Sequence, residues 1–578
     1  MNGPVAPVRI ALAQIDASVG DLGGNAELIV ARIAEAREAG AELVLFPELA
    51  ITGYPPEDLL LKEHFLARAR EALERVAEAA RGIVVLVGFP ERGFDAYNAL
   101  AVCADGAVHS IYRKTVLPNY GVFDEQRYFQ VGEGGAVIDV GGVRIGLTIC
   151  EDMWTPGPPA SDEALAGASL ILNASASPYH VGKGLERERM LAQRARDNIC
   201  AVAFTNLVGG QDELVFDGHS LIVDHEGTVV ARAPQFAEAL VVADVDVQAA
   251  ITARLRDTRL RPPVRRHLPD VRLMGELPRA ADVPRGPVGG TVTETLEPEA
   301  EVYAALALGV RDYVEKNGFR HVVIGLSGGI DSALTALIAV DALGPERVTC
   351  VTMPSRYSSS GTRSDAKVLA DNLGVELHEI AIAPAMEAYD GLLEPFFEGR
   401  EPDIIEENLQ ARIRGNLLMA LSNKFGWLVL TTGNKSENSV GYSTLYGDSA
   451  GGFAVIKDVP KTLVYRLVDF RNARDDSHPV PRSLIDRPPS AELREDQRDA
   501  DALPDYDTLD VILEAYVEED AGRERLLAAG LPAEAVDRVI ALVDRAEYKR
   551  RQAPPGIKIT PRAFGRDRRM PITNRYRG

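Results

Sequence analysis

The chain alternates short apolar runs with longer amphipathic stretches, and this alternation sets its expected architecture. Short runs that are apolar throughout are typical of strands buried on both faces. In the first half they lie at 8–15, 42–48, 83–90, 144–150, 169–175 and 200–206. The stretch 25–40 instead spaces its apolar residues as a helix does and ends at Gly40, a common helix stop. Strands alternating with helices predict a layered α/β domain over residues 1–270.

The composition changes near the middle of the chain. Residues 271–299 lose hydrophobic periodicity and gain Pro and Gly, which predicts a linker. Residues 300–578 resume the alternation with a helix at 300–316. The apolar runs that follow lie at 321–326, 347–354, 376–383 and 427–433. This order predicts a doubly wound parallel sheet. The charged, Pro-rich stretch 471–505 is long enough to predict a functional or disordered loop.

Composition and charge limit the function classes. The 578 residues are 46% hydrophobic and 26% charged, as in ordinary globular proteins, and the net charge is −22. That charge argues against general binding of nucleic acid or an anionic membrane. Four scattered cysteines predict no disulfide framework, and no signal peptide or long apolar span is recognisable, so we expect a cytoplasmic protein. The basic stretch 548–578 favours a solvated tail over a phosphate or subunit contact.

The run "GLSGGIDS" at 325–332 joins an apolar strand to an apolar helix. A glycine turn in that position directs backbone N–H groups and a helix N-terminus at an anion. Ser327 and Ser332 add hydroxyl donors, but the lysine of a P-loop is missing. Asp331 would repel a phosphate, so we expect it to hold Mg²⁺ that bridges phosphate oxygens. The plain alternative is a tight connection that binds nothing.

A second strand end carries "TTGNKSE" at 431–437. Functional groups in open parallel sheets gather at the carboxyl ends of the strands. Glu437 is therefore the expected second Mg²⁺ ligand, and Thr432 is placed to contact a nucleotide. The alternative for Glu437 is an acid that only complements a helix dipole.

These residues resemble a known family. "SGGIDS" resembles the pyrophosphate-gripping loop of the N-type ATP pyrophosphatases, which cleave ATP between the α- and β-phosphates. "TGNKSE", "YSTLYGD", "IKDVPKT" and "RPPSAEL" resemble motifs of NAD synthetases, which adenylate the carboxylate of deamido-NAD before ammonia displaces AMP. The resemblance spans roughly residues 320–570 and implies ATP and deamido-NAD as substrates, with Mg²⁺. We also expect a homo-oligomer.

The resemblance implies roles for single residues. The ATP phosphates would bind Gly325, Leu326, Ser327, Gly328, Gly329, Ile330, Asp331 and Ser332. The implied metal ligands are Asp331 and Glu437, and the other ATP contacts are Thr432, Lys461 and Ser490. The positions near deamido-NAD are Asn408, Glu437, Tyr442, Ser443, Thr444, Leu445 and Lys549. The chain departs from the short ammonia-dependent synthetases at Leu445, where those carry a basic side chain.

Three polar residues of the first half stand near the ends of apolar runs: Glu48, Lys114 and Cys150. Most free cysteines are simply buried small side chains. That description fits Cys103, Cys200 and Cys350. Lys and Glu, however, are rarely buried unless paired. A cysteine nucleophile needs a base, and acyl transfer needs a cation near the developing oxyanion. We therefore assign Glu48 as base, Lys114 as electrostatic stabiliser and Cys150 as nucleophile.

This trio resembles the Glu–Lys–Cys site of the nitrilase superfamily, whose fold is an αββα sandwich, across about residues 5–265. The resemblance implies that Glu125 is that family's additional glutamate beside the catalytic trio. Its glutaminase members imply that the glutamine-binding residues are Tyr120, Ser177 and Lys183. An ordinary solvated lysine is the alternative for Lys183.

The two halves together resemble a glutamine-dependent NAD synthetase, in which the first half makes ammonia from glutamine and the second consumes it. Other amidotransferases with the same loop are alternatives, but GMP synthetase pairs it with a Cys-His-Glu domain. Asparagine synthetase uses an N-terminal cysteine, whereas this chain begins Met1-Asn2. Two further alternatives are an ammonia-dependent synthetase with a non-catalytic first domain and an amidase with a nucleotide-sensing second domain.

Overall fold

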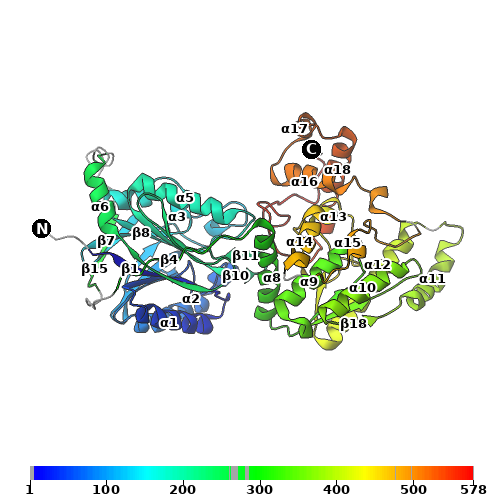
Figure 1. Ribbon diagram of the computed structural model, residues 1–578, viewed down its shortest axis with the longest axis horizontal. Coiled ribbons are helices and arrows are strands. Elements are labelled where there is room, and N and C mark those ends of the chain that lie inside the picture. Colours follow the sequence, from blue (N-terminus) through cyan, green and yellow to red (C-terminus); the bar gives the residue numbers. More distant parts are fainter. Residues whose placement is uncertain are drawn as a thin grey trace. The chain divides into compact units, whose positions relative to one another are not determined.

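The computed structural model describes residues 6–258, 261, 271–279, 286–401, 403–474, 477–495 and 497–576. They fall into two compact units, which are coloured blue to green and green to red in Figure 1. The first unit comprises Met1–Gln211 and Val215–Leu296, and the second comprises Asp212–Leu214 and Glu297–Gly578. Among the described residues, no helix is both long enough and apolar enough to cross a bilayer.

Two sheets packed face to face form the centre of the first unit. The strand order of one sheet is β14-β1-β2-β3-β4-β5, and its strands are Ala239–Val245, Val8–Gln14, Leu43–Leu45, Val84–Arg92, Ala96–Ala104 and Ala107–Arg113. The order of the other is β13-β12-β9-β8-β7-β6-β15, with strands Val229–Arg232, Leu221–Val223, Ala201–Asn206, Leu170–Ser175, Val143–Ile149, Gly135–Val140 and Val271–Leu277. Side chains of both sheets share one buried apolar cluster.

Helices cover the outer faces of this sandwich (Figure 1). Helices α1 (Leu22–Glu38) and α2 (Glu63–Ala79) pack on the first sheet, and α4 (Ala160–Leu165) and α5 (Lys183–Asn198) pack on the second. The expected αββα sandwich is therefore confirmed.

One segment expected as linker is a strand instead. Residues 271–277 form β15, which pairs in parallel with β6 and places Leu277 in the core. The Pro and Gly residues that suggested a linker lie mostly after this strand, and residues 280–285 lie outside the described part of the chain. Sequence patterning missed β15 because its partly buried edge position needs little apolar character.

The second unit is built on a five-stranded sheet with the order β18-β17-β16-β19-β20. The strands are Glu376–Glu379, Val348–Thr352, Val322–Gly325, Leu428–Thr431 and Phe453–Ala454, and every neighbouring pair is parallel. The chain runs outward from β16 through β17 to β18 and then returns to β19 on the other side of β16. Ligands bind at such a reversal, outside the carboxyl ends of the strands. The predicted doubly wound sheet is confirmed.

Helices surround this sheet, and a smaller helical group follows it. The helices packed around the sheet include α8 (Pro298–Lys316), α9 (Ile330–Leu343), α10 (Ser360–Leu373), α12 (Ile404–Phe425) and α14 (Lys461–Ala473). The later group, α16 (Tyr506–Leu513), α17 (Arg523–Ala528) and α18 (Ala533–Arg545), has its own apolar core.

The basic C-terminal stretch is not a solvated tail, contrary to the expectation from composition. Ile557 and Ile559 are fully buried, and Asp458 accepts hydrogen bonds from the backbone N–H groups of Ile559 and Thr560, both at 2.8 Å. The expectation rested on the many arginines of this stretch and overlooked its alternating apolar residues. These apolar residues anchor the segment in the second unit.

Candidate active sites

Four side chains predicted for amide chemistry meet inside the first unit. Glu48 and Lys114 are 0% exposed, Cys150 is 2% exposed and Glu125 is 4% exposed. Lys114 Nζ donates to Glu48 Oε1 at 2.6 Å and to the two Glu125 oxygens at 2.9 and 2.8 Å. Glu48 and Lys114 also lie close enough to Cys150 to act electrostatically on its thiol. The structure therefore places the predicted base, cation and nucleophile in one cluster.

Two local backbone features build this cluster. Cys150 follows β7 with φ 41° and ψ −99°, a conformation that L-residues avoid and that is found disproportionately at functional sites. The helix α3 (Glu151–Trp154) begins directly after it. On the opposite sheet, a Cβ at Gly88 would lie 2.3 Å from Leu49 N and 2.7 Å from the carbonyl carbon of Glu48. Glycine in β3 therefore lets the Glu48 segment approach the sheet closely.

The charges of the cluster follow from its burial. Burial raises the pKa of Cys150 well above its usual range, and Glu48 adds to this effect while Lys114 opposes it. The thiol is therefore protonated in the free site and needs a base to become a nucleophile. Burial alone would lower the pKa of Lys114, but Glu125 and Glu48 outweigh it and raise that pKa well above its usual range. Lys114 is a permanent cation.

Sequence reasoning missed two residues of this site. Asn98 in β4 is fully buried and donates to Glu48 Oε1 at 2.7 Å, and the Tyr54 hydroxyl donates to Glu125 Oε1 at 3.0 Å. Glu48 Oε2 accepts from the Ala176 N–H at 3.0 Å. The available signal was an amide side chain inside an apolar strand, because a buried polar group needs a partner.

Two of the residues predicted to bind glutamine surround Cys150. The Tyr120 hydroxyl hydrogen-bonds to Glu151, at 3.0 Å from Oε2, and Lys183 Nζ lies 3.9 Å from the centre of the Trp154 ring. Both Tyr120 and Lys183 interact electrostatically with Cys150. Burial lowers the pKa of Lys183, although this cation keeps a partner in Glu186.

The third, Ser177, is held by a buried ion pair. It follows β8 next to Ala176, whose N–H contacts Glu48. Arg187 and Asp217 are both fully buried and pair through two contacts of 3.1 Å. The Arg187 guanidinium also reaches the Ser177 hydroxyl and carbonyl oxygens, both at 3.4 Å.

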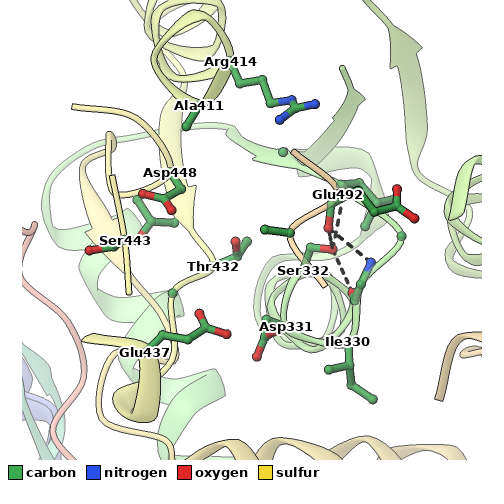
Figure 2. Close-up of a pocket in the computed structure, with 18 of the residues that line it drawn as sticks. Ile330, Asp331, Ser332, Ala411, Arg414, Thr432, Glu437, Ser443, Asp448 and Glu492 are labelled. Carbon is green, nitrogen blue, oxygen red and sulfur yellow. Dashed lines mark hydrogen bonds between the residues drawn. The ribbon is translucent and has the colours of Figure 1, made fainter. Parts of the chain in front are cut away.

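The second unit contains a cavity of about 320 Å³ at the carboxyl ends of β16, β17 and β19 (Figure 2). All eight residues of the 325–332 loop line it. The other predicted residues in its wall are Thr432, Glu437, Tyr442, Ser443, Lys461 and Ser490. Cavities of this size, with a few converging polar groups, are typical small-molecule sites.

The loop itself is compact because of one glycine and two hydroxyls. Gly328 has φ +83°, and a Cβ there would lie 2.3 Å from the Thr362 carbonyl oxygen, so a larger residue would displace α10. The Ser332 hydroxyl donates to the Gly329 carbonyl at 2.9 Å and lies 3.1 Å from the Ser327 hydroxyl. These contacts hold the loop at the start of α9. The first residues of this helix, Ile330 and Asp331, line the cavity, so the helix N-terminus can bind an anion there.

Two carboxylates predicted as metal ligands converge on one cation position. Lys461 Nζ pairs with Asp331 Oδ2 and, at 3.2 Å, with Glu437 Oε1; Figure 2 shows both acids in the same wall. Asn434 accepts from the Glu437 N–H and donates to Asp331 Oδ1, both at 2.9 Å. Burial raises the pKa of Glu437 to about 7, although Lys461 opposes the shift.

This pair of carboxylates fits a magnesium ion. In the described part of the chain, no three His, Cys, Asp or Glu side chains group as a complete metal site. Mg²⁺, however, is commonly held by one or two carboxylates together with substrate phosphates and water. Two hard oxygen ligands beside the 325–332 loop match that requirement.

Four of the positions assigned to deamido-NAD do not reach the cavity wall. Among the described residues, the cavity lining does not include Asn408, Thr444, Leu445 or Lys549. The Thr444 hydroxyl instead donates to Asn408 Oδ1 at 2.8 Å. Lys549 Nζ donates to the carbonyls of Gly441 and Ser443 at 2.8 and 2.7 Å. Asn408 and Lys549 thus contact the 441–445 segment, whose Tyr442 and Ser443 do line the cavity.

Several cavity residues were not singled out from the sequence. Arg414, Asp448 and Asp499 line the wall, and Arg487 donates to the Gly328 carbonyl at 3.2 Å. Asp448 and Arg487 lie within the quoted motifs "YSTLYGD" and "RPPSAEL", so the signal was present. The 471–505 segment is not a structureless loop. It includes the end of α14, and its residues 488–493 and Asp499 line the cavity. Within this segment, residues 475–476 and 496 lie outside the described part of the chain.

Comparison with known proteins gives a family for each half of the chain. Residues 9–255 match the carbon-nitrogen hydrolase family and residues 302–553 match the NAD synthase family. A glutamine-dependent NAD(+) synthetase of Thermotoga maritima is 48% identical over 575 residues, covering 99% of each chain. That of Aquifex aeolicus is 48% identical over 98% of this chain and 100% of its own length. The chain belongs to the family of glutamine-dependent NAD(+) synthetases.

Solved members of this family share the fold. The glutamine-dependent NAD+ synthetase from Acinetobacter baumannii, in complex with adenosine diphosphate, aligns over 98% of both chains with a TM-score of 0.74 and 41% identity. A synthetase from Cytophaga hutchinsonii aligns over the same share with a TM-score of 0.80 at 24% identity, which supports the fold.

Proposed function

We propose that the protein is a glutamine-hydrolysing NAD synthetase. It converts ATP, deamido-NAD, L-glutamine and water to AMP, diphosphate, NAD and L-glutamate. Residues 1–270 act as the glutaminase and residues 300–578 as the synthetase. The observation that carries the proposal is that a buried Glu48–Lys114–Cys150 cluster and a lined nucleotide-sized cavity occur in one chain.

In the first unit, Cys150 attacks the glutamine side-chain amide. Glu48 accepts the thiol proton, which the raised pKa of Cys150 keeps in place until substrate arrives. Lys114 stabilises the negative charge that develops on the amide oxygen. Glu48 returns the proton to the departing ammonia, and water then hydrolyses the thioester. Tyr120, Ser177 and Lys183 bind the amino-acid end of glutamine.

In the second unit, the 325–332 loop binds the ATP phosphates. The carboxylate of deamido-NAD attacks the α-phosphorus, diphosphate leaves, and ammonia then displaces AMP from the acyl adenylate. Lys461 lies in the wall beside the loop, where its ammonium can neutralise phosphate charge. Thr432 and Ser490 contact the nucleotide, and Tyr442 and Ser443 contact deamido-NAD.

The synthetase reaction uses Mg²⁺, held by Asp331 and Glu437. When bound, the ion neutralises phosphate charge and favours departure of diphosphate. Asp331 and Glu437, which pair with Lys461 in this structure, would hold the ion, and the Lys461 ammonium would then be available to contact phosphate. The four cysteines are free, which suits a reducing cytoplasm.

The products distinguish this function from its alternatives. We expect purified protein with ATP, Mg²⁺, deamido-NAD and glutamine to release AMP, diphosphate and NAD in equal amounts, because the loop lacks the P-loop lysine. Chromatography of the nucleotides measures this. ADP and phosphate as products would contradict α–β cleavage. ATP binding without turnover would instead support an amidase with a nucleotide-sensing domain.

We further propose that the protein forms a homo-oligomer through α11 (Ala383–Phe397) and the start of α12. No described residue of α11 is buried, and four apolar side chains of this region are strongly exposed. They are Leu392 at 70%, Phe396 at 79%, Ile404 at 66% and Ile405 at 43%. Leu392 and Phe396 lie one helical turn apart on α11, which contacts α12, and exposed apolar patches commonly mark a protein interface.

Replacing Leu392 and Phe396 together by Glu should dissociate the oligomer, because charge cannot be buried in an apolar contact without partners. Sedimentation velocity measures the change in mass. Phe94→Glu is the matched control, since Phe94 is an exposed aromatic side chain of the first unit and belongs to neither α11 nor α12. If the double variant sediments as the wild type does, this surface is not the interface.

A further inference from the structure

Asp152 is a buried carboxylate that none of the steps above uses. It lies two residues after Cys150 in α3 and is 0% exposed. Its Oδ1 accepts from the Thr115 N–H at 3.0 Å, from the Thr115 hydroxyl at 2.8 Å and from the Val116 N–H at 2.8 Å. Thr115 and Val116 directly follow Lys114. At this point β5 has ended, and their backbone N–H groups no longer pair with a neighbouring strand.

The other oxygen of Asp152 binds one group on each side of the site. Oδ2 accepts from the Ile149 N–H at 2.9 Å and from the Tyr112 hydroxyl at 2.8 Å. Ile149 is the residue before the nucleophile, and Tyr112 lies near the end of β5. One carboxylate thus joins the backbone just before Cys150 to the backbone just after Lys114.

We propose that Asp152 is a positioning residue for thioester formation, which fixes the Lys114 ammonium relative to Cys150 by binding the segments next to both. The proposal rests on the proposed glutaminase reaction. Lys114 is already charged through Glu48 and Glu125, so Asp152 is not needed to ionise it. What those two acids do not supply is a rigid link between the lysine loop and the turn that carries Cys150.

The chemistry of the contacts requires the ionised form of Asp152. Every hydrogen bond described for its oxygens comes from an N–H or O–H donor, and both oxygens face backbone N–H groups, which can only donate. In an Asn side chain, an NH₂ group replaces one of the two oxygens. In either orientation of the amide, this NH₂ group faces backbone N–H donors. Asp152→Asn therefore keeps the size of the side chain but repels one of the two segments.

We expect Asp152→Asn to lower kcat for glutamine hydrolysis by about 10- to 100-fold, the scale on which small misplacements of catalytic groups act. KM for glutamine should stay within about twofold, because the lost interaction acts in the transition state. Release of glutamate measures both constants. Glu163→Gln is the matched control: Glu163 is a fully buried carboxylate of the same unit that interacts electrostatically with Asp152 but accepts from the Ala136 N–H rather than from the Lys114 loop.

A double-mutant cycle separates positioning from general support of the fold. Lys114→Met alone should lower the rate of thioester formation by about 10²–10³, the scale of one oxyanion-stabilising group. Adding Asp152→Asn to Lys114→Met should then lower it by less than about twofold, because coupled residues are not additive. Thr115→Val, which removes one bond to Oδ1, should show the same dependence on Lys114 and serves if Asp152→Asn does not fold.

Three results would overturn the inference. One is an equal loss in the wild-type and Lys114→Met backgrounds, and another is an equal loss in Glu163→Gln. The third is full activity of folded Asp152→Asn, checked by circular dichroism. A wild-type protein without glutaminase activity would instead contradict the proposed function, so the two failures are distinguishable.

Discussion

Cys150→Ala is expected to abolish glutamine-dependent NAD synthesis and to leave ammonia-dependent synthesis intact. The substitution removes the one atom that can form the thioester, and loss of a covalent nucleophile lowers kcat on the order of 10⁶. Cys150 is nearly fully buried and Ala fits a small buried position, so the unit should still fold. The synthetase cavity draws its lining from the second unit, so its chemistry does not need the thiol.

The measurement is NAD formation with glutamine and, separately, with ammonium salts at mildly alkaline pH, where more of the nitrogen is NH₃. Cys200→Ala is the matched control, because Cys200 is a fully buried thiol in an apolar cluster of the same unit. Glutamine-driven synthesis by Cys150→Ala would show that another residue is the nucleophile. Loss of ammonia-driven synthesis in a folded variant would show that the two sites are coupled more tightly than two independent units.

The positions of both candidate sites could be predicted because they depend on residues at the ends of buried strands. Glu48, Lys114 and Cys150 follow strands of two facing sheets, and residues at such ends are fixed by the strands that carry them. The same reasoning placed Asp331 and Glu437 after neighbouring parallel strands. Local patterning therefore located these groups, and the positive φ of Cys150 marks a sharp turn directly after its strand.

What the sequence did not reveal depends on contacts between distant segments. Asn98 and Asp152 form hydrogen bonds with residues tens of positions away in the sequence, and no periodic pattern indicates these contacts. The C-terminal stretch was misjudged for a related reason, since Asp458 and the buried Ile559 hold a segment whose composition is that of a tail. Asn408, Thr444 and Lys549 form hydrogen bonds around the 441–445 segment and are not among the cavity-lining residues, and their assignment to deamido-NAD stays a prediction.

Asp331→Asn and Glu437→Gln are expected to lower NAD formation by about 10²–10³ with either nitrogen source, the scale for losing one electrostatic contribution at a reacting centre. Each keeps the shape of its side chain but removes a charge that faces the common cation position. Glutamate release by the first unit should persist, because the Cys150 cluster contains neither residue. NAD formation measured across Mg²⁺ concentrations should also show a weaker dependence on the ion.

The same helix supplies the control. Asp341 lies in α9 with Asp331 and pairs with Arg471 at 2.6 and 3.0 Å, but it is not among the residues that line the cavity. Asp341→Asn therefore removes an equivalent ion pair without touching the cation position, and should keep the wild-type dependence on Mg²⁺. If Asp331→Asn and Glu437→Gln match Asp341→Asn at every Mg²⁺ concentration, the two acids only pair with Lys461. If both lose synthesis and Asp341→Asn does not, the convergence of Asp331 and Glu437 on one position is the metal site that adenylation requires.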